Sequence, residues 1–492
     1  MPTDPAPPPL LIRRAELRGG AVADVRIAGG RIVAIGALSP EPGESAIDAA
    51  GGLLLPGLHD HHIHVAASAA AMGSVPCGPP QVTDAAALAG RLATPGTGWL
   101  RGTGYHESVA GMIDRNWIDA VAPERPVRVQ HRSGRMWVFN TAGLDLLLSS
   151  GLKPPDGLER IDGRPTGRLF DEDGWVRAAL GGTMPDFAAI GAELARLGIT
   201  GVTDMSPAND DAVAVHFAAE HRRGALPQRV LLAGQIALGA GAGAGVAVGP
   251  VKLHLHEQHL PPLEAMVATM SAAHQAGRAV AVHCVTEAEL AITLAALAEA
   301  GTRPGDRIEH ASVAPDHAVA AIADMGLAVV AQPHFISERG DVYRDAIPSE
   351  DWPALYRLRA FREAGVTLAG GSDAPFGRPD PWTAMAAAVT RRTASGAAIG
   401  AEEALTPEEA LDLFLADPVA LARTRTVQVG ADGDLCLLDR PWRQSRGALD
   451  AGLVRMTMMA GTIRFARESP HDPPTAWPKA PRPPHCGPAP AV

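Results

Sequence analysis

Cysteines, aromatic residues and long apolar runs are all scarce in this sequence. The four cysteines lie far apart with no CxxC pair, which argues against a disulfide framework and against a cysteine-ligated zinc site. No uninterrupted apolar run approaches the roughly 18 residues that span a bilayer. Residues 1–9 also lack a basic region followed by an apolar stretch. We therefore expect a soluble, cytoplasmic protein with no membrane partner.

An excess of positive charge is also absent. The chain has 43 Lys+Arg against 54 Asp+Glu, a net charge of −11, so it has no overall attraction for nucleic acid or anionic lipid. Its 46% hydrophobic and 20% charged residues are typical of a globular protein. The 492 residues are enough for two to four domains.

Short strand patterns occur at both ends of the chain. Alternating apolar segments separated by glycine-rich turns lie at 10–14, 25–27, 31–35 and 52–55, and again at 433–438, 453–460 and 462–465. They predict one composite β-sandwich built from residues 1–55 and 425–468. The proline-rich segment 469–492 is expected to be a poorly ordered tail.

The middle of the chain alternates apolar strand-like runs with Ala/Leu-rich helical runs. The strand-like runs are 53–58, 201–205, 229–233, 251–256, 279–283, 307–310, 328–332 and 366–370. Helical runs are expected at 211–223, 263–276, 287–300, 316–325 and 352–364. Eight such units predict an α/β fold, a (β/α)₈ TIM barrel over residues 56–424. The segment from about 66 to 195, with strand signals at 99–102 and 127–131, is too long for a loop and is expected to be an inserted capping subdomain.

Histidine is concentrated where the first barrel strand ends. His59, His61, His62 and His64 occupy four of six consecutive positions. In an extended strand, residues i and i+2 share a face, so His62 and His64 can converge on one ion at the carboxyl-terminal mouth of the barrel. Two imidazoles suit Zn²⁺, Fe²⁺ or Co²⁺ better than Mg²⁺ or Ca²⁺. Taken alone, the segment could equally be a histidine-rich polar loop.

Three later strands each end in a residue type that binds metals. They are His283 after Ala-Val, His310 after Ile-Glu, and Asp373 after Gly-Gly-Ser. A single histidine is more often packed in a core or exposed at a surface, but all three sit at strand ends in barrel order. They therefore predict a site for one or two divalent ions, with zinc favoured.

Three motifs resemble the amidohydrolase superfamily: PGLHDHHIH at residues 56–64, RIEHAS at 307–312 and GGSDAP at 370–375. The composite β-sandwich is similar to that superfamily's companion domain. The resemblance implies that His62, His64 and Asp373 bind one metal and that His283 and His310 bind a second. The segments GWLRGTGY, GRPTGRLFDED and GITGVTDM resemble the branch that contains N-substituted formamide deformylases.

Lys252 ends the expected fourth strand, in GPVKLHLH. The resemblance implies that this lysine is carboxylated and bridges two metals. The alternative is a lysine that lies along a strand edge with its ammonium group in water. His254 and His256 share its face by the period of two, and either line the pocket, with His256 contacting substrate, or are polar strand ends.

These parts predict hydrolysis of a non-peptide carbon–nitrogen bond in a small molecule. Bound metal lowers the pKa of water and polarises a carbonyl, while Asp373 takes the proton of the water and passes it to the leaving nitrogen. An amide, a cyclic amide and an N-substituted formamide all fit. A mononuclear deaminase is the first alternative, although Glu287 is one residue too far from His283 for an HxxE motif. A non-enzymatic scaffold is the second, although scaffolds typically lose metal ligands.

Further candidates for substrate binding are Arg135, Trp137 and His334. The resembling branch carries a histidine before the tryptophan where this chain has Arg135, so Arg135 either contacts an acidic substrate group or lies at the surface. His334 follows the seventh strand and either lines the pocket or is packed. A homodimer is the oligomeric state that the resemblance suggests.

Overall fold

The computed structural model describes residues 8–79, 81–133, 135–181, 184–239, 243 and 245–467. The chain forms two compact units. Among the described residues, the main unit comprises residues 8–65 and 186–467, and the inserted unit spans Ala66–Pro185. The predicted tail at 469–492 lies outside the described residues. Of the helices that the structure describes, none is long and apolar enough to cross a membrane.

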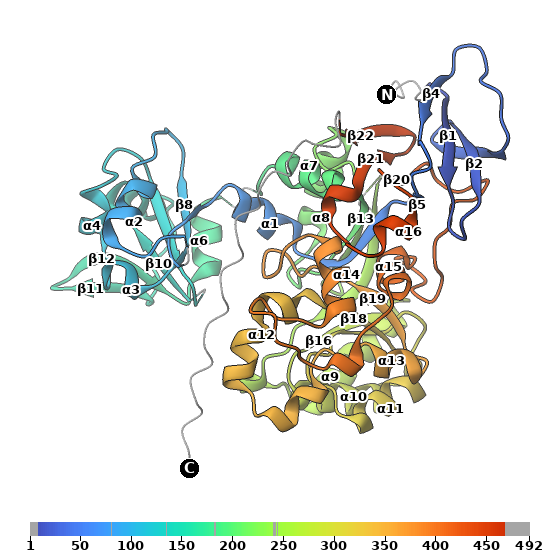
Figure 1. Ribbon diagram of the computed structural model, residues 1–492. Coiled ribbons are helices and arrows are strands. Elements are labelled where there is room, and N and C mark those ends of the chain that lie inside the picture. The colour runs from blue at the N-terminus through green and yellow to red at the C-terminus, as the bar shows by residue number, and fades with distance from the viewer. Residues whose placement is uncertain are drawn as a thin grey trace. The chain divides into compact units, whose positions relative to one another are not determined.

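An eight-stranded parallel sheet forms the centre of the main unit, in the order β19-β18-β17-β16-β15-β14-β13-β6 (Figure 1). Two backbone hydrogen bonds join its outer strands: Asp373 N donates to His62 O (2.6 Å) and His64 N donates to Ala374 O (2.9 Å). The predicted (β/α)₈ barrel is confirmed. Its strands are β6 (Leu58–Ile63), β13 (Ile199–Asp204), β14 (Arg229–Gly234), β15 (Val246–Leu253), β16 (Val280–Cys284), β17 (Arg307–His310), β18 (Ala328–Ala331) and β19 (Thr367–Gly370).

Helices alternate with these strands, as the Ala/Leu-rich runs predict. Two of them, α10 and α15, begin with a capping box in which a threonine and a glutamate satisfy each other's backbone N–H groups. The helices are α7 (Ala188–Arg196), α8 (Asp211–Arg222), α9 (Leu263–Gln275), α10 (Glu287–Ala300), α11 (Asp316–Asp324), α12 (His334–Ala346), α13 (Arg359–Glu363), α14 (Pro381–Thr390), α15 (Pro407–Leu415) and α16 (Trp442–Ser445). Short 3₁₀ turns are η1 (Glu257–His259), η2 (Ser349–Ala354), η3 (Ala401–Glu403) and η4 (Ala451–Leu453).

The first barrel strand begins later than the sequence pattern predicts. Residues 53–58 are not one strand, because β5 (Leu54–Pro56) pairs with the C-terminal sheet and β6 starts only at Leu58. The chain passes from the sandwich to the barrel at Gly57. The N–H of Gly57 donates to Asp434 O of the sandwich, and Leu58 N donates to Gly198 O beside the barrel. A Cβ on Gly57 would lie 2.1 Å from the Thr200 side chain, so only glycine fits there.

Two other predicted boundaries are wrong. The fourth strand was expected at 251–256 but is Val246–Leu253, because it pairs with β14 from Val246 on, with a register shift at Gly249 and Pro250, and with β16 from Val251 on. The helix expected at 352–364 is instead the turn η2 followed by the short helix α13, with Pro353 inside the turn. Proline cannot donate a helical hydrogen bond, which explains the break.

Both chain ends build one β-sandwich, as predicted. The N-terminal sheet has the order β3-β2-β1-β4 and the C-terminal sheet the order β22-β21-β20-β5, and the two lie side by side in Figure 1. Residues from both sheets, among them Ile12, Val25, Leu437 and Met458, share one apolar core. The strands are β1 (Leu10–Glu16), β2 (Val22–Ala28), β3 (Arg31–Gly36), β4 (Ser45–Asp48), β20 (Leu435–Leu438), β21 (Val454–Met459) and β22 (Thr462–Ala466).

The inserted unit has its own six-stranded sheet, in the order β11-β12-β10-β9-β8-β7. Two of its strands confirm the predicted signals at 99–102 and 127–131. The unit ends at Pro185, earlier than the expected 195, since α7 packs against β13 and β21 of the main unit. Its elements are β7 (Val75–Pro76), β8 (Leu100–Tyr105), β9 (Val127–His131), β10 (Met136–Phe139), β11 (Leu158–Ile161), β12 (Arg164–Phe170), α2 (Ala85–Leu92), α3 (Glu107–Ala110), α4 (Arg115–Asp119), α5 (Thr141–Leu148) and α6 (Asp173–Ala179), with α1 (Val65–Met72) leading into it. Its capping role stays a prediction.

Candidate metal centre

Three of the predicted ligands converge where β6 and β19 end. His62 Nε2 and His64 Nε2 lie 3.4 and 3.2 Å from the same oxygen, Oδ1 of Asp373. One ligand atom from each of the three residues falls within 4.8 Å of the other two. The bonds between Asp373 N and His62 O and between His64 N and Ala374 O fix this approach, because they hold the ends of the two strands together.

The backbone is strained at two of the predicted ligands. Asp373 has a backbone φ of +52° and His310 has a backbone φ of +71°, values that residues other than glycine seldom adopt. Each residue stands at the carboxyl end of a barrel strand, where the chain must turn. Such conformations persist only where the surroundings enforce them, and they cluster at functional sites.

The other two predicted histidines continue from this group in a row of neighbouring rings. The ring centroids of His62 and His310 are 4.7 Å apart, and those of His310 and His283 are 4.6 Å apart. His254 follows at 4.3 Å from His283, and His256 at 4.6 Å from His254. The structure therefore brings His283 and His310 beside His62, and it adds His254. His256, at the end of the row, is exposed.

Lys252 is buried in the barrel, on β15. Its side chain is 6% exposed, and Nζ has no hydrogen-bond partner among the described residues. The alternative of a strand-edge lysine with its ammonium group in water therefore does not hold. Burial lowers the pKa of Lys252 to about 8. A buried amine without a partner is costly, so this position favours a chemical use for the lysine.

Three histidines of this group have Nδ1 held by an oxygen atom. His62 Nδ1 contacts Glu309 Oε2 at 2.5 Å, His64 Nδ1 contacts Ser206 Oγ at 3.1 Å, and His310 Nδ1 contacts Gln332 Oε1 at 2.7 Å. An oxygen on Nδ1 leaves Nε2 available as a ligand and fixes the plane of the ring.

Glu309 and Arg307 were not predicted as site residues. Both lie on β17 and are at most 2% exposed. Glu309 Oε1 forms an ion pair with Arg307 Nε at 2.6 Å, while its other oxygen contacts His62. Two charged residues at alternate positions of a buried strand were the signal that could have revealed them, since charges are rarely buried without a specific partner.

Two buried aspartates anchor the loops beside the ligands. Asp204, which ends β13, accepts hydrogen bonds from Val65 N (2.7 Å) and Ser206 N (3.0 Å). Asp60 Oδ1 accepts from Ser372 N at 2.9 Å and from His62 N at 3.1 Å. Burial raises the pKa of Asp60 to about 6. These aspartates position the backbone on either side of His62, His64 and Asp373.

Opposing effects set the charge of the group. Burial by itself would raise the pKa of Asp373, but the imidazoles of His64, His62 and His310 lower it well below its ordinary value. Burial lowers the pKa of His62, and of His283 and His310 as well. Burial therefore favours the uncharged imidazole at His62, His283 and His310, and the histidines around Asp373 favour its carboxylate, which are the protonation states in which these side chains bind metals.

The remaining substrate-binding candidates occupy other surroundings. His334, the first residue of α12, is fully buried, and its Nε2 lies 3.0 Å from the carbonyl oxygen of Ser372. Trp137 is buried in the core of the inserted unit and donates to Asp173 Oδ1 at 2.7 Å. Arg135, in the same unit, pairs with Asp171 at 2.7 Å, and its side chain is 74% exposed. Substrate contacts for these three residues and for His256 stay predictions.

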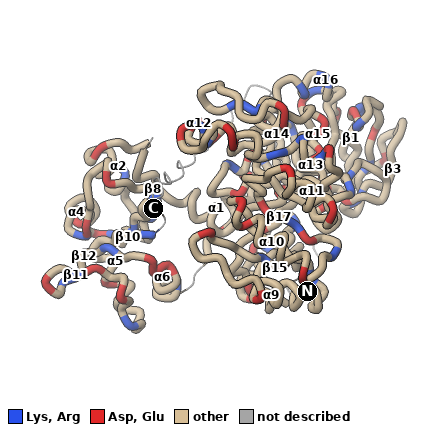
Figure 2. Tube along the Cα trace, turned by 90° about the horizontal axis from the view of Figure 1, so that it is seen from below, with Lys and Arg blue, Asp and Glu red and all other residues tan. Residues whose placement is uncertain are grey.

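Acidic and basic residues are interspersed along the described chain. Figure 2 shows Lys and Arg side by side with Asp and Glu on helices of both units. Many form ion pairs, such as Arg359 with Glu409 at 2.7 Å and Arg357 with Glu403 at 2.9 Å.

The barrel, the composite sandwich and the histidine-rich strand ends define the class of protein. The sequence pattern of the amidohydrolase family matches residues 45–465. The chain therefore belongs to the amidohydrolase family, and it is a hydrolase that acts on carbon–nitrogen bonds. The predicted superfamily resemblance is confirmed.

Known relatives cover nearly the whole chain. An N-substituted formamide deformylase from Arthrobacter pascens is 26% identical, over 93% of this chain and 97% of the relative. An uncharacterized metal-dependent hydrolase from Pyrococcus horikoshii has a similar structure, with a TM-score of 0.73 at 19% identity over 88% of this chain and 97% of that one. N-isopropylammelide isopropylaminohydrolase from Burkholderia multivorans has a TM-score of 0.52 at 19% identity, over 92% of this chain and 97% of that one. At these identities the two structures show a shared fold.

Proposed function

We propose that this hydrolase is metal-dependent and cleaves the carbon–nitrogen bond of an N-substituted formamide or a related small amide. The observation that carries the proposal is the convergence of His62 Nε2 and His64 Nε2 on Asp373 Oδ1 at the carboxyl-terminal mouth of the barrel. That face holds the active site in characterised enzymes of this fold. Similarity to a formamide deformylase over 93% of the chain supports the substrate class.

The donor set fits a divalent transition metal. Two imidazoles and a carboxylate offer N and O donor atoms within 4.8 Å of one another, which would suit zinc, with iron and cobalt as alternatives. Glu309 and Ser206 hold the Nδ1 atoms of His62 and His64, so both Nε2 atoms are left for the ion. His283 and His310 would serve a second ion beside the first.

Lys252 completes the second position if it is carboxylated. Its neutral amine would join carbon dioxide, with formation of one N–C bond and release of one proton, to give an anionic carbamate. The buried Nζ supports this step because it has no hydrogen-bond partner among the described residues. The oxygens of a carbamate, in contrast, would have metal ions to bind. The hydrolase would then hold two ions, and otherwise one.

The residues at the mouth account for the chemistry. A bound divalent metal lowers the pKa of a water molecule and polarises the substrate carbonyl. Asp373 is the proton carrier: Oδ1 faces the two histidines, and Oδ2 has no hydrogen-bond partner among the described residues. It takes the proton of the attacking water and delivers it to the leaving nitrogen. Gln332 and Glu309 keep His310 and His62 in their orientations throughout.

A deaminase on the same fold is less well supported. It would need a glutamate beside His283 to carry protons. The glutamates that follow His283 along the chain begin α10, where Glu287 is exposed and Glu289 Oε2 already accepts from Val285 N (2.7 Å) and Thr286 N (3.2 Å). Glu289 therefore caps α10, and Glu287 lies in the first turn of the same helix. Glu309, which pairs with His283 across the sheet, is engaged by His62 and Arg307.

A cytoplasmic location agrees with the cysteines. Cys77, Cys284 and Cys436 are buried free thiols, as expected in a reducing compartment.

The test is a substrate panel on the purified full chain, with N-alkyl and N-aryl formamides, the matching acetamides, cyclic amides and aminated heterocycles. Release of formate and amine from formamides, lost on chelation and restored by zinc, would support the proposal. Release of ammonia from the heterocycles alone would establish the deaminase instead.

A further inference from the structure

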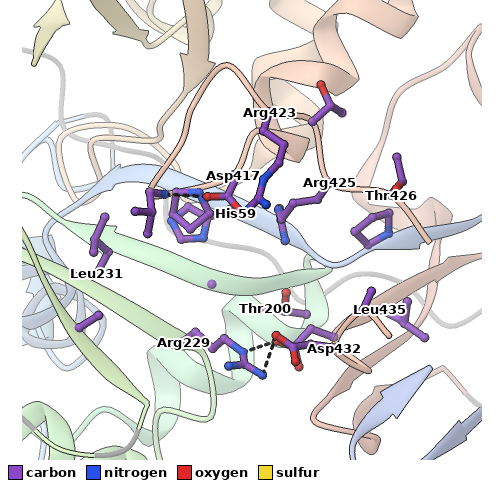
Figure 3. A pocket seen from close by; sticks show the side chains of 18 of the residues that line it. His59, Thr200, Arg229, Leu231, Asp417, Arg423, Arg425, Thr426, Asp432 and Leu435 are labelled. Atoms are coloured by element: carbon purple, nitrogen blue, oxygen red, sulfur yellow. Dashed lines mark hydrogen bonds and ion pairs between the residues drawn. The ribbon is translucent and has the colours of Figure 1, made fainter. Parts of the chain in front are cut away.

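A cavity lies at the opposite end of the barrel from the candidate metal centre. It encloses about 510 Å³. Arg229 and Val246, the first residues of β14 and β15, line it, together with the segment 417–426 and residues of the sandwich (Figure 3). Because the strands are parallel, their amino-terminal ends face away from the mouth that holds His62 and Asp373. Its volume is in the range of small-molecule pockets.

Three arginines and three aspartates line the cavity, but one of the arginines has no aspartate as an ion-pair partner. Arg229 Nε pairs with Asp434 at 2.5 Å, and its Nη2 reaches Asp432 at 3.2 Å. Arg423 pairs with Asp417 at 2.5 Å. The three carboxylates that line the cavity are therefore already engaged by two of its arginines.

Arg425 is the third arginine of the cavity, and it has no ion-pair partner. No carboxylate oxygen of the described residues lies within 4.0 Å of its guanidinium. Its Nε and Nη2 donate to the backbone oxygens of Ala416 (3.2 Å) and Phe414 (3.1 Å), which fixes the side chain, while Nη1 has no partner among the described residues. Figure 3 shows the guanidinium directed into the hollow.

A shielded guanidinium without a counter-charge is unfavourable. Transfer of a charge out of water is compensated only by pairing and hydrogen bonds, and burial lowers the pKa of Arg425 to about 10. An anion in the cavity would pair with this guanidinium directly and accept the free Nη1–H bonds.

His59 provides a second polar group at the same place. Its side chain is 3% exposed, Nε2 contacts Thr203 Oγ1 at 2.9 Å, and Nδ1 has no partner among the described residues. A Cβ at residue 201 would lie 2.4 Å from Nδ1, so Gly201 makes the space in which this ring sits. His59 and Arg425 both line the cavity.

The wall also carries apolar side chains, beside polar ones such as Thr200 and Gln428. Ile32, Pro56, Val230, Leu231, Val246 and Leu435 contribute to it. Arg425 is a single cation without an ion-pair partner and has aspartates nearby, so it favours a monoanion over a dianion such as phosphate. The apolar side chains of the wall favour a ligand with a hydrocarbon body. We propose that this cavity binds a small organic carboxylate, with its carboxylate at Arg425. The inference is independent of the proposed function.

The test is calorimetric titration of the full chain with hexanoate, with the neutral hexanamide and with inorganic phosphate. Hexanoate should bind at least about tenfold more tightly than the amide, since a hydrogen bond to a charged group carries that much discrimination. Phosphate should bind more weakly than hexanoate. Equal binding of acid and amide, or no binding of hexanoate, would overturn the proposal.

Two arginine variants locate the site. Arg425→Met should weaken hexanoate binding at least about tenfold. Its matched control, Arg446→Met, removes an arginine that is paired with Glu408 and does not line the cavity, and it should leave the affinity unchanged. Equal loss in both variants would contradict the assignment. Hexanoate held at the metal centre instead would survive Arg425→Met and be lost in His64→Asn.

A third variant covers the case in which Arg425→Met does not fold. Thr426→Trp fills the cavity from an exposed position on its wall and leaves Arg425 in place. It should abolish hexanoate binding while the protein keeps its melting temperature. Unchanged binding in this variant would overturn the proposal.

Discussion

Glu309 Oε2 lies 2.5 Å from His62 Nδ1, while Oε1 of the same carboxylate pairs with Arg307 at 2.6 Å. A buried arginine, a glutamate and a histidine thus form one chain of contacts that ends at the candidate metal centre. Glu309 is 0% exposed and His62 1% exposed, so water does not compete for either contact. The carboxylate orients the ring and makes Nε2 the more basic nitrogen.

Glu309→Gln should weaken metal binding about 10- to 100-fold, the usual effect of losing a partner behind a metal-binding histidine. The affinity is measured by competition with a chelator on samples checked for folding. The control is Glu403→Gln, because Glu403 is also buried and paired with an arginine, Arg357, but lies away from the mouth. If both variants lose affinity equally, the effect is one of stability, and Glu309 does not position His62.

Lys252→Met should reduce the metal content of protein grown with zinc and bicarbonate from about two ions per chain toward one. The reason is that the variant cannot form the carbamate that would bridge the ions. Lysine is rare in this chain, at positions 153, 252 and 479 only, and the exposed Lys153 provides the control substitution Lys153→Met. A metal content that is the same in all three proteins would show that Lys252 is not a ligand.

Asp373→Asn should lower kcat by about 10²- to 10⁴-fold, the range for loss of a general base and acid. The amide keeps an oxygen donor, so kcat should fall far more than the metal content, which is determined on the same samples. Asp380→Asn is the control, since Asp380 caps α14. Retention of near-normal kcat in Asp373→Asn would exclude this residue as the proton carrier.

Stability at acidic pH should depend on Glu409. Hydrogen bonds from Arg359 lower the pKa of Glu409 to about 2, against about 4.3 for an unfolded glutamate. The contribution of Glu409 is therefore complete above the unfolded value and is lost as the pH falls toward about 2. The difference in unfolding free energy between the wild type and Glu409→Gln should shrink between about pH 5 and pH 2, measured by denaturant titration. A difference independent of pH would contradict the assignment.

Much of the fold could be predicted from the sequence, because strand and helix periods are local. The helix predicted at 287–300 is α10 with the same bounds, since Thr286 and Glu289 form its capping box. The first barrel strand was misplaced because the apolar run 53–58 crosses from one sheet to another at Gly57. Nothing local to the run shows which neighbour each half will pair with.

The histidines and the aspartate that gather at the mouth could also be predicted, since barrel order places strand ends on one face. Their supporting contacts could not. Each histidine is held by a residue from another strand or loop: His62 by Glu309, His64 by Ser206 and His310 by Gln332. Glu309 adjoins His310 in the sequence, yet it contacts His62. Which residues meet across the barrel is decided by register and closure, and these emerge only when all eight strands are assembled.

The most direct test of the central claim is elemental analysis of the purified full chain beside His62→Asn and Asp373→Asn, all grown with added zinc. The account predicts at least one equivalent of a divalent transition metal in the wild type and its loss in His62→Asn, with hydrolysis of formamides falling in parallel. Wild-type protein without metal, or with a metal content and an activity that His62→Asn leaves unchanged, would contradict it.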